Sequence, residues 1–508
     1  MLAKNSASAI EKHNAPAIDT LAALRASGYV SRTVKEELRE NLILRLQSGQ
    51  DVFPGIWGYE ETVIPELERA ILSMHNVNLL GLRGQAKTRL ARMMVNLLDE
   101  WIPVVAGSEL NDDPLKPISR FAIDLVAEKG DNTPITWLHR SDRYTEKLAT
   151  PDVSVADLIG DADPIKAANL KLPYSDERVI HFGLIPRAHR GIFVINELPD
   201  LQARIQVALF NILQEGDIQI RGFKVRLPLD IQFVFTANPE DYTNRGSIVT
   251  PLKDRIDSQI LTHYPGDIAT GKKITRQEAY IKPAQTAITY GEIALDLIEQ
   301  LAIEARKSEY VDAKSGVSAR LTISALETLV SAAERRMLVN GEAKTHVRMS
   351  DYWGIVPAVT GKIELVYEGE QEGSAIVARN LVGKAIRTLF TTYFPDPEKA
   401  KKGKDKSKNP YKSIIGWFGN GNSVDILANA SEIEYSQTLH SVPGLQALVE
   451  TYAQGETEGE KLFMMEFALH GLAEFSSLSR SALAGGNRFR DLLSSMLDMK
   501  AGDDEDDE

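Results

Sequence analysis

The segment GLRGQAKTRL, residues 81–90, carries two glycines that are followed by a lysine and a threonine. In the pattern G-x-x-x-x-G-K-[ST], backbone N–H groups hold phosphate oxygens, the lysine reaches the terminal phosphates and the hydroxyl binds Mg²⁺. Lys87 and Thr88 fit the last two positions, but Ala86 replaces the second glycine. A methyl group is tolerated there if φ is negative and is costly if φ is positive. The segment predicts a nucleotide site, with a coincidental glycine loop as the alternative.

A second candidate group follows the apolar run in RGIFVINELPD. Glu197 stands where a strand should end, which suits a general base that polarises an attacking water. Asn196 offers an amide oxygen to a Mg²⁺-bound water but brings no charge, so weaker metal binding or slower turnover is expected. An ordinary helix start, with Asn196 as the N-cap and Glu197 in the first turn, is the alternative.

Three further polar residues could act near a γ-phosphate. Asn238 ends the run IQFVFTAN and could orient the water, or it could be a turn residue. Arg255 could neutralise charge on the phosphate of a neighbouring subunit, or could pair with Asp254 or Asp257 on the surface. Arg320, in SGVSARL, starts a predicted helix from which it could contact a nucleotide.

These side chains need strands and helices that position them. Residues 1–50 are predicted to be helical, because VKEELRENLILRLQSG has helical apolar spacing and ends at a glycine. From residue 51 to 262, short apolar strands alternate with amphipathic helices, and we expect strands at 76–80, 121–126, 191–196 and 231–238. DIQIRGFKVRLPL is typical of a hairpin around Gly222. One helical face after the phosphate loop is predicted to carry Leu90, Met94, Leu97, Leu98 and Trp101.

The rest of the chain is predicted to be mostly helical. Residues 263–367 form one helical region and residues 368–500 another, which includes a Lys- and Pro-rich linker at 395–412. The acidic tail 501–508 should be disordered.

Composition narrows the class of protein. The chain has no cysteine and a formal net charge of −13, which excludes disulfides and argues against unspecific nucleic-acid binding. The N-terminus lacks a signal-peptide pattern and no long apolar run is present, so we expect a cytoplasmic protein without a membrane span. The nine histidines form no metal-binding motif.

The order and spacing of these motifs resemble those of the AAA+ ATPases, in the branch of the magnesium-chelatase ATPase subunit and the MoxR-like ATPases. The segment FPGIWGYEETVIPELERAIL (53–72) looks like the one that lies against adenine in that family. DLIGDADP (157–164), followed by GLIPRAHRGIFVINELPDL (183–201), is similar to the chelatase subunit up to and through its Walker B strand. The resemblance covers about residues 51–340.

The resemblance implies an α/β fold, with an AAA+ P-loop αβα core at 51–262 and a helical lid at 263–367. It also implies a set of site residues. Nucleotide binding falls to Gly81, Gly84, Gln85, Ala86, Lys87, Thr88 and Arg89, together with Ile56 and Trp57 of the adenine segment. The residues implied to hold Mg²⁺ are Thr88 and, through water, Asn196. The residues implied to act in catalysis are Glu197 of Walker B, Asn238 as sensor 1, Arg255 as arginine finger and Arg320 as sensor 2. An alanine before the lysine also occurs in MoxR-like loops, whereas Asn196 departs from the family's acidic pair.

The implied function is that of an ATP- and Mg²⁺-dependent ring motor, usually hexameric, which remodels a partner protein that typically has a von Willebrand A domain. Three alternatives stay open. The chain could be the ATPase subunit of a magnesium chelatase, or a nucleotide-gated scaffold with weak hydrolysis because of Asn196. It could also be a σ54-type transcription activator, although it lacks the GAFTGA loop expected of that class.

Overall fold

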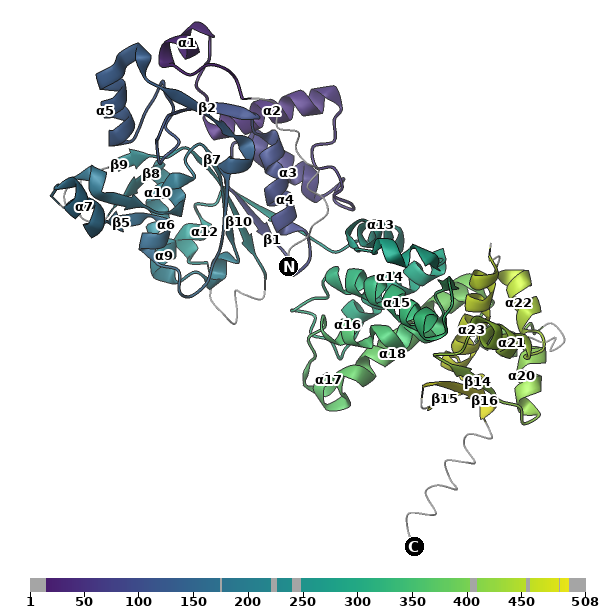
Figure 1. Ribbon diagram of the computed structural model, residues 1–508. Coiled ribbons are helices and arrows are strands. Elements are labelled where there is room, and N and C mark those ends of the chain that lie inside the picture. Colours follow the sequence, from purple (N-terminus) through teal and green to yellow (C-terminus); the bar gives the residue numbers. More distant parts are fainter. Residues whose placement is uncertain are drawn as a thin grey trace. The chain divides into compact units, whose positions relative to one another are not determined.

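The computed structural model describes residues 15–173, 176–220, 226–239, 248–402, 409–453, 457–483 and 485–492 (Figure 1). The chain forms two compact units, Met1–His263 and Tyr264–Glu508. The predicted hairpin turn at Gly222 and the predicted tail 501–508 lie outside the described residues.

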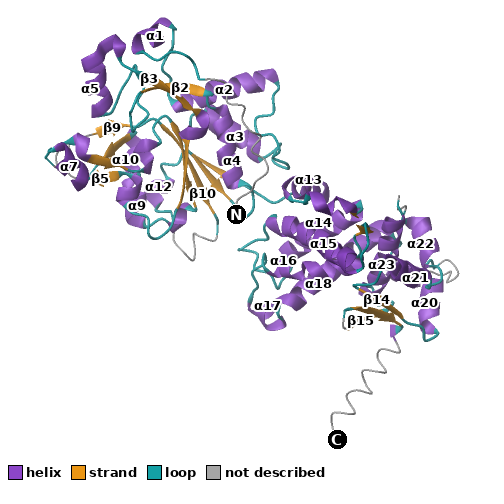
Figure 2. Ribbon diagram, in the orientation of Figure 1, coloured by secondary structure: helices purple, strands orange, loops and turns teal. Residues whose placement is uncertain are grey.

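A parallel five-stranded sheet forms the centre of the first unit (Figure 2). Its strands lie in the order β11-β1-β10-β7-β4, and every neighbouring pair is parallel. The carboxyl ends of all five strands therefore meet at one edge, which is where α/β sheets bind their ligands. The bounds are β1 (Val77–Leu80), β4 (Tyr144–Leu148), β7 (Gly191–Asn196), β10 (Ile231–Ala237) and β11 (Ser258–Leu261).

Alternating side chains of these strands build one hydrophobic core on each face of the sheet. Ile192 and Val194 of β7 face one core, whereas Phe193 and Ile195 face the other. The first core is closed by α2 (Val34–Ser48), α3 (Val63–Leu72) and α4 (Lys87–Met93). The second is closed by α9 (Ala203–Ala208), α10 (Phe210–Glu215) and α12 (Thr250–Lys253). The predicted αβα layering is confirmed.

The predicted N-terminal helix is also confirmed, as α2. Thr33 and Glu36 form a capping box at its start, and Gly49 ends it with a φ of 67°. Leu38 and Leu42 on its buried face pack into the first core. A shorter helix, α1 (Leu21–Ala26), precedes it.

The predicted strand at 121–126 is wrong, because these residues form the helix α5 (Arg120–Lys129). The Ser119 side chain caps the helix by accepting from the Ala122 backbone N–H. Ala122 is buried, whereas Phe121 and Ile123 are 47% and 41% exposed. Polar residues and an N-cap serine therefore outweigh the short apolar run, which has the composition of a buried strand but not its setting.

The sequence prediction also missed parts of the first unit. β4 and β11 were not predicted, because YTEKL and SQIL are too polar to stand out as buried strands. Trp101 is not on the helix after the phosphate loop, since α4 gives way to the 3₁₀ turn Met94–Leu97 and Trp101 begins β2.

Antiparallel pairs join β2 (Trp101–Val105) to β3 (Ile135–His139), β5 (Gly160–Ala162) to β6 (Ile180–Phe182), and β8 (Asp217–Gln219) to β9 (Arg226–Pro228). The last pair agrees with the predicted hairpin. The described part of the unit also contains the short helices α6 (Val155–Leu158), α7 (Pro164–Leu170) and α8 (Leu184–Arg187).

The second unit is mainly helical, as predicted. Its longest helices are α14 (Glu292–Lys307), α15 (Arg320–Val339), α18 (Ser374–Tyr393) and α23 (Glu458–Glu474). Shorter helices are α13 (Ile268–Glu278), α16 (Val356–Thr360), α17 (Tyr367–Glu372), α19 (Pro397–Lys402), α20 (Lys412–Gly419), α21 (Glu432–His440) and α22 (Leu445–Tyr452). The strands are β12 (Ile288–Thr289), β13 (Thr345–His346), β14 (Val424–Leu427), β15 (Ser479–Leu483) and β16 (Gly486–Arg490). β14–β16 form a small antiparallel sheet that the sequence did not predict.

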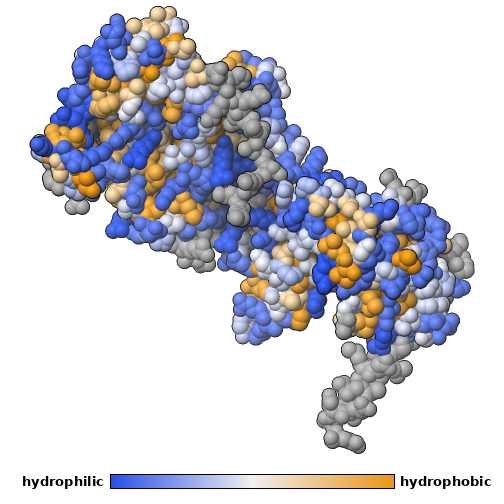
Figure 3. Space-filling model, in the orientation of Figure 1, coloured by the Kyte–Doolittle hydropathy of each residue, from blue (hydrophilic) through white to orange (hydrophobic). Residues whose placement is uncertain are grey.

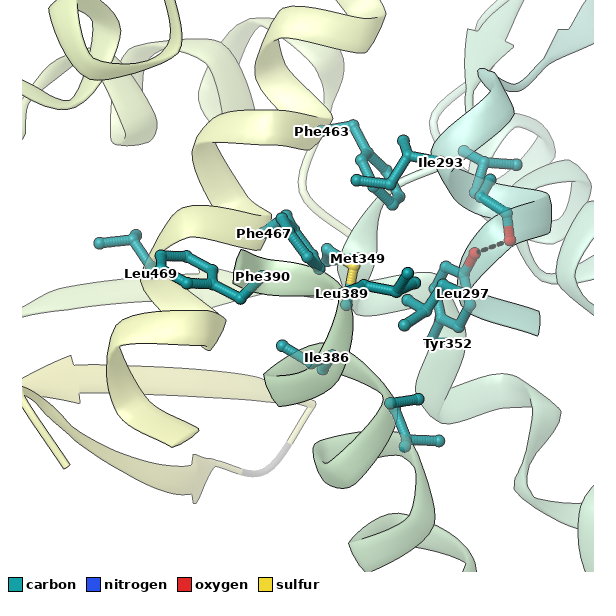
Figure 4. Packing of buried hydrophobic residues seen from close by; sticks show 14 of the residues in the cluster. Ile293, Leu297, Met349, Tyr352, Ile386, Leu389, Phe390, Phe463, Phe467 and Leu469 are labelled. Carbon is teal, nitrogen blue, oxygen red and sulfur yellow. Dashed lines mark hydrogen bonds between the residues drawn. The ribbon is translucent and has the colours of Figure 1, made fainter. Parts of the chain in front are cut away.

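One hydrophobic core runs through this unit, from Ile288 to Phe489. Figure 4 shows Phe390 of α18 beside Phe467 of α23, and the ring centroids are 6.0 Å apart. In the same cluster, the Tyr352 hydroxyl donates to the Ala294 carbonyl of α14 at 2.6 Å. The predicted lid region and the predicted C-terminal region therefore share one interior.

None of the helices in the described ranges has the length and apolar character needed to span a membrane. On the face seen in Figure 3, hydrophobic residues are interspersed with hydrophilic ones.

Candidate functional site

The loop between β1 and α4 has two glycines that its geometry requires. A Cβ at Gly81 would lie 1.9 Å from the Thr262 Oγ1 and 2.2 Å from the Gln85 Oε1, so any larger residue would displace the Thr262 and Gln85 side chains. Gly84 has a φ of 74°, which favours glycine. The loop lies at the carboxyl edge of the sheet, directly after β1.

Ala86, the residue that departs from the pattern, has a φ of 56° and a ψ of 14°. This left-handed conformation costs a non-glycine residue roughly 1–2 kcal/mol. The loop therefore keeps the backbone shape that a second glycine would allow and holds it with strain. Ala86 also packs against the first core, which offsets part of that cost.

The Lys87 ammonium group lies inside the loop and reaches the neighbouring strand. Its Nζ donates to the carbonyls of Gly81 and Leu82, and to the Asn238 Oδ1 at 2.8 Å. Asn238 is buried and follows directly on β10. The structure thus brings together the predicted phosphate-binding lysine and the predicted water-orienting asparagine, which are far apart in the sequence.

A second set of contacts joins α4 to β7. The Thr88 Oγ1 lies 3.4 Å from the Asn196 Oδ1, at the end of β7. The Thr236 hydroxyl on β10 donates to the same Asn196 oxygen at 3.1 Å and accepts from the Glu197 N–H at 3.1 Å. Glu197 is half-buried and has a left-handed φ of 56°. The predicted metal and base residues therefore lie in one hydrogen-bonded group.

The donor set fits a Mg²⁺–phosphate group. Hydroxyl, amide and carboxylate oxygens are the hard ligands that Mg²⁺ prefers, and Lys87 supplies a cation for the phosphates. Within the described ranges, no three His, Asp or Glu side chains lie close enough together to hold a metal ion by themselves.

Parts of this chain are similar in sequence to known proteins. The family model described as the Sigma-54 interaction domain matches residues 173–259, which include β7, β10 and Arg255. The magnesium-chelatase 38 kDa subunit of Cereibacter sphaeroides is 26% identical over 208 residues, which are 40% of this chain and 56% of the relative. The same subunit of Rhodobacter capsulatus is 24% identical over 229 residues, which are 44% of this chain and 59% of the relative. The matched part thus spans little more than half of these relatives.

A solved chain from the complex between subunits BchI and BchD of magnesium chelatase is 18% identical, with a TM-score of 0.32. The matched part is 63% of this chain and 98% of the solved chain. The family assignment rests on the sequence matches together with the parallel sheet and its loop. This chain contains an AAA+ ATPase domain that is similar to the magnesium-chelatase 38 kDa subunits.

The sequence prediction missed one carboxylate of the AAA+ domain. Glu146, on β4, accepts from the Asn196 Nδ2 at 2.8 Å through its Oε1. Arg92 of α4 donates to both Glu146 oxygens, at 2.9 and 3.0 Å. The Tyr144 hydroxyl donates to the Oε2 at 3.0 Å, and burial together with the Glu146 charge raises the pKa of Tyr144. No motif indicated Glu146, because its strand lies at the polar edge of the sheet and only the parallel pairing with β7 brings it to Asn196.

Tyr59 was missed as well, although it lies in the segment that resembles the family's adenine segment. Its hydroxyl lies 2.9 Å from the Gln85 carbonyl and 2.8 Å from the His263 carbonyl. The Gln85 side chain accepts from the Thr262 hydroxyl at 2.7 Å. The phosphate loop is thereby tied to the last residues of the first unit.

The remaining predicted residues of the AAA+ domain lie outside these contacts. Ile56 is buried in the first core, and Trp57 is 37% exposed. Arg89 is half-buried on α4. The assignment of these residues to nucleotide binding stays a prediction.

The two predicted catalytic arginines lie in different units. The Arg255 guanidinium donates to the Gln214 Oε1 at 2.9 and 3.0 Å and to the Pro251 carbonyl at 2.6 Å. Asp257, one of its possible ion-pair partners, instead accepts from the Asn76 N–H at 2.8 Å. Arg320 is exposed and begins α15 in the second unit. The roles predicted for both arginines stay predictions.

At the amino ends of β7 and β10, a buried polar network fixes the two strands. The Asp230 N–H donates to the His189 Nδ1 at 2.9 Å, and the Asp230 carboxylate accepts from the Val34 N–H at 2.8 Å. Burial, and then the charge of Arg190, lowers the pKa of His189 to about 4. Burial raises the pKa of Asp230 to about 6. This network is structural, because it lies at the opposite end of the strands from the phosphate loop.

Proposed function

We propose that this chain binds Mg²⁺-ATP at Lys87 and Thr88 and hydrolyses it in a ring of identical subunits, and that hydrolysis changes the conformation of a partner protein. The single observation that carries the proposal is the junction of three elements at one sheet edge. Lys87 contacts Asn238 and Thr88 contacts Asn196, so the loop and two strand ends form one site.

Each residue has a role that follows from its position. Lys87 binds the terminal phosphates, and the loop N–H groups hold phosphate oxygens. Bound Mg²⁺ would neutralise charge on the phosphates, with Thr88 and Asn196 as the residues that hold it. Glu197, held through its N–H by Thr236, accepts the proton of the attacking water, and Asn238 orients that water.

The ring and its partner are further parts of the proposal. An arginine that acts on the phosphate of a neighbouring copy requires assembly, and Arg255 is the candidate for this role. The partner that we favour carries a von Willebrand A domain, as the resemblance to the MoxR-like branch implies. Cytoplasmic location and a hexameric ring also belong to this proposal.

The experiment combines nucleotide binding with phosphate release. Lys87→Ala should lose binding of a fluorescent ATP analogue in the presence of Mg²⁺. Glu197→Gln and Arg255→Ala should keep binding and lose phosphate release by about 100-fold or more, because each removes stabilisation of the transition state alone. Arg226→Ala, which removes an exposed arginine from β9, is the matched control for Arg255→Ala.

Two outcomes would contradict this proposal. If Lys87→Ala binds nucleotide as the parent does, the site is wrong. If the parent releases phosphate no faster than Glu197→Gln, the nucleotide-gated scaffold replaces the motor.

The ATPase subunit of a magnesium chelatase is the second candidate function, because the two relatives are named as magnesium-chelatase 38 kDa subunits. It predicts that the chain supports metal insertion into a porphyrin when it is mixed with the other subunits of such an enzyme. Absence of insertion beside active ATP hydrolysis would favour the first candidate. The match to the Sigma-54 interaction domain supports the AAA+ core, but the chain lacks the GAFTGA loop that a σ54 activator needs.

A further inference from the structure

The amide of Asn196 lies between two groups that together fix its orientation. Its Nδ2 donates to the Glu146 Oε1 at 2.8 Å, and a carboxylate can only accept at neutral pH. The Asn196 Oδ1 must therefore point the other way, toward the Thr236 hydroxyl and the Thr88 Oγ1. Glu146 thus aims the amide oxygen at the place where a Mg²⁺-bound water is expected.

Glu146 also brings a negative charge next to the neutral Asn196 side chain. Asn196 stands at the end of β7, where the family's pattern has an acid, and it is neutral. Glu146 lies on the adjacent strand within hydrogen-bonding distance of Asn196, and its side chain keeps 24% of its accessible surface. A negative charge so close to Asn196 acts on a cation at the site over a short, partly buried path.

We propose that Glu146 and Asn196 form a split acidic residue for Mg²⁺, in which Asn196 provides the oxygen and Glu146 provides the charge and holds the amide in place. This inference rests on the proposed binding of Mg²⁺-ATP. Glu146 is a positioning residue here, because it acts through Asn196. Its four hydrogen-bond partners, two on Arg92 and one each on Asn196 and Tyr144, occupy its acceptor sites.

Arg92 adjusts this charge. Its guanidinium forms a bidentate ion pair with Glu146, and its side chain is 54% exposed. The pair is bidentate and Glu146 is only 24% exposed, so the guanidinium also holds the carboxylate in place beside Asn196. Removal of the arginine should leave a more effective negative charge beside Asn196.

The decisive test exchanges the two side chains. In the variant E146Q/N196D, the carboxylate moves to position 196 and the amide to position 146, and the hydrogen bond between them can form in the reverse direction. Mn²⁺ affinity is measured by electron paramagnetic resonance with saturating ADP, as a substitute for Mg²⁺. Binding of a fluorescent ADP in EDTA is measured in parallel, because it tests the nucleotide site without metal.

E146Q alone should weaken Mn²⁺ affinity by about tenfold or more, which is the usual effect of removing a group that orients a metal ligand. E146Q/N196D should recover affinity to within about threefold of the parent. R92Q should strengthen Mn²⁺ binding by about threefold, and R120Q, which breaks the separate Arg120–Asp124 pair on α5, should change nothing.

Parental Mn²⁺ affinity in E146Q, or absence of recovery in the exchanged variant, would overturn the inference. If E146Q does not fold, the direction of the R92Q effect decides the matter, and weaker or unchanged Mn²⁺ binding in R92Q overturns it. If the parent does not bind nucleotide even in EDTA, the proposed function fails, and that result differs from a parent that binds nucleotide but is indifferent to Glu146.

Discussion

Two non-glycine residues of the site, Ala86 and Glu197, both have a left-handed backbone with a φ of 56°. Such conformations cost free energy and persist only where surrounding contacts enforce them. Ala86 lies directly before α4, in the loop that we propose binds phosphate, and Glu197 lies directly after β7, where we propose that its carboxylate acts as the base. The strain therefore lies at the two positions where the site needs an unusual backbone.

Ala86→Gly should raise the free energy of unfolding of the nucleotide-free protein by about 1 kcal/mol, because glycine adopts this φ without strain. Urea unfolding measures the effect. The matched control is Ala127→Gly on the exposed side of α5, which should lower stability by about 1 kcal/mol. Equal losses in both variants would show that Ala86 is not strained.

Thr236→Val removes one hydroxyl without changing the shape of the side chain. It leaves the Glu197 N–H without its acceptor and takes one donor from Asn196, which should cost about 1–3 kcal/mol. We expect phosphate release to fall by about tenfold while nucleotide affinity in EDTA stays near the parental value. An equal loss of nucleotide binding would indicate a general disturbance of the sheet.

At this scale, the residue types of the site were predictable and their partners were not. Lys87, Thr88 and Asn238 stand in motifs that chemistry makes recognisable. Glu146 stands in no motif, because its role depends on which strand lies beside β7. Strand order is a property of the folded sheet, and spacing along the chain does not reveal it.

At the scale of elements, apolar content alone was a weak guide. The run FAIDLV has the composition of a buried strand, yet it forms a helix that begins at a capping serine. β7 and β10 were predictable, because their apolar runs are buried on both faces. β4 and β11 lie at the two edges of the sheet, where burial is incomplete and polar residues are tolerated. Their sequences therefore lack the apolar pattern from which a buried strand is predicted.

The start of β10 depends on a neutral histidine. The pKa of His189 in the folded protein is about 4, below the value near 6.5 in an unfolded chain, so the unfolded chain binds more protons between these values. The stability that His189 contributes is present above pH 6.5 and is lost as the pH falls toward 4. Asp230 acts in the opposite direction, because its raised pKa of about 6 means that its contribution falls as the pH rises from about 4 to 6.

His189→Asn separates the two groups, because its Oδ1 can still accept from the Asp230 N–H. The difference in free energy of unfolding, parent minus variant, should increase by up to about 3 kcal/mol as the pH rises from 4 to 6.5. Urea titrations across this range measure the difference. Arg190, Asp112 and Asp113, the other charged groups that act on His189, stay in place in both proteins. A difference that does not vary with pH would contradict the depressed pKa.

At the scale of the whole molecule, the described residues of the second unit share one hydrophobic core. Helices from the predicted lid region and from the predicted C-terminal region contribute to the same cluster of buried residues. The sequence could predict helices in both regions, but not that α14 and α18 would share an interior. The predicted boundary at 367/368 cuts through this shared core.

Phe390→Ala should therefore destabilise the whole second unit by about 3–5 kcal/mol, because the ring is buried against Phe394 after α18, Tyr411 before α20 and Phe467 on α23. Tyr367→Ala, which removes a largely exposed ring, should change stability by less than about 0.5 kcal/mol. Unfolding is followed by the fluorescence of Trp353 and Trp417 in a background in which Trp57, Trp101 and Trp137 of the first unit are replaced by Phe. A small effect of Phe390→Ala would mean that the two regions unfold separately.

The Tyr59 hydroxyl has a mechanical consequence. It lies between the carbonyls of Gln85, in the phosphate loop, and of His263, the last residue before the second unit begins. One proton serves both oxygens, so any shift of the loop relative to the segment that leaves the domain strengthens one bond at the expense of the other. A nucleotide that moves the phosphate loop would therefore also change the hydrogen bond between the Tyr59 hydroxyl and the His263 carbonyl, at the end of the first unit.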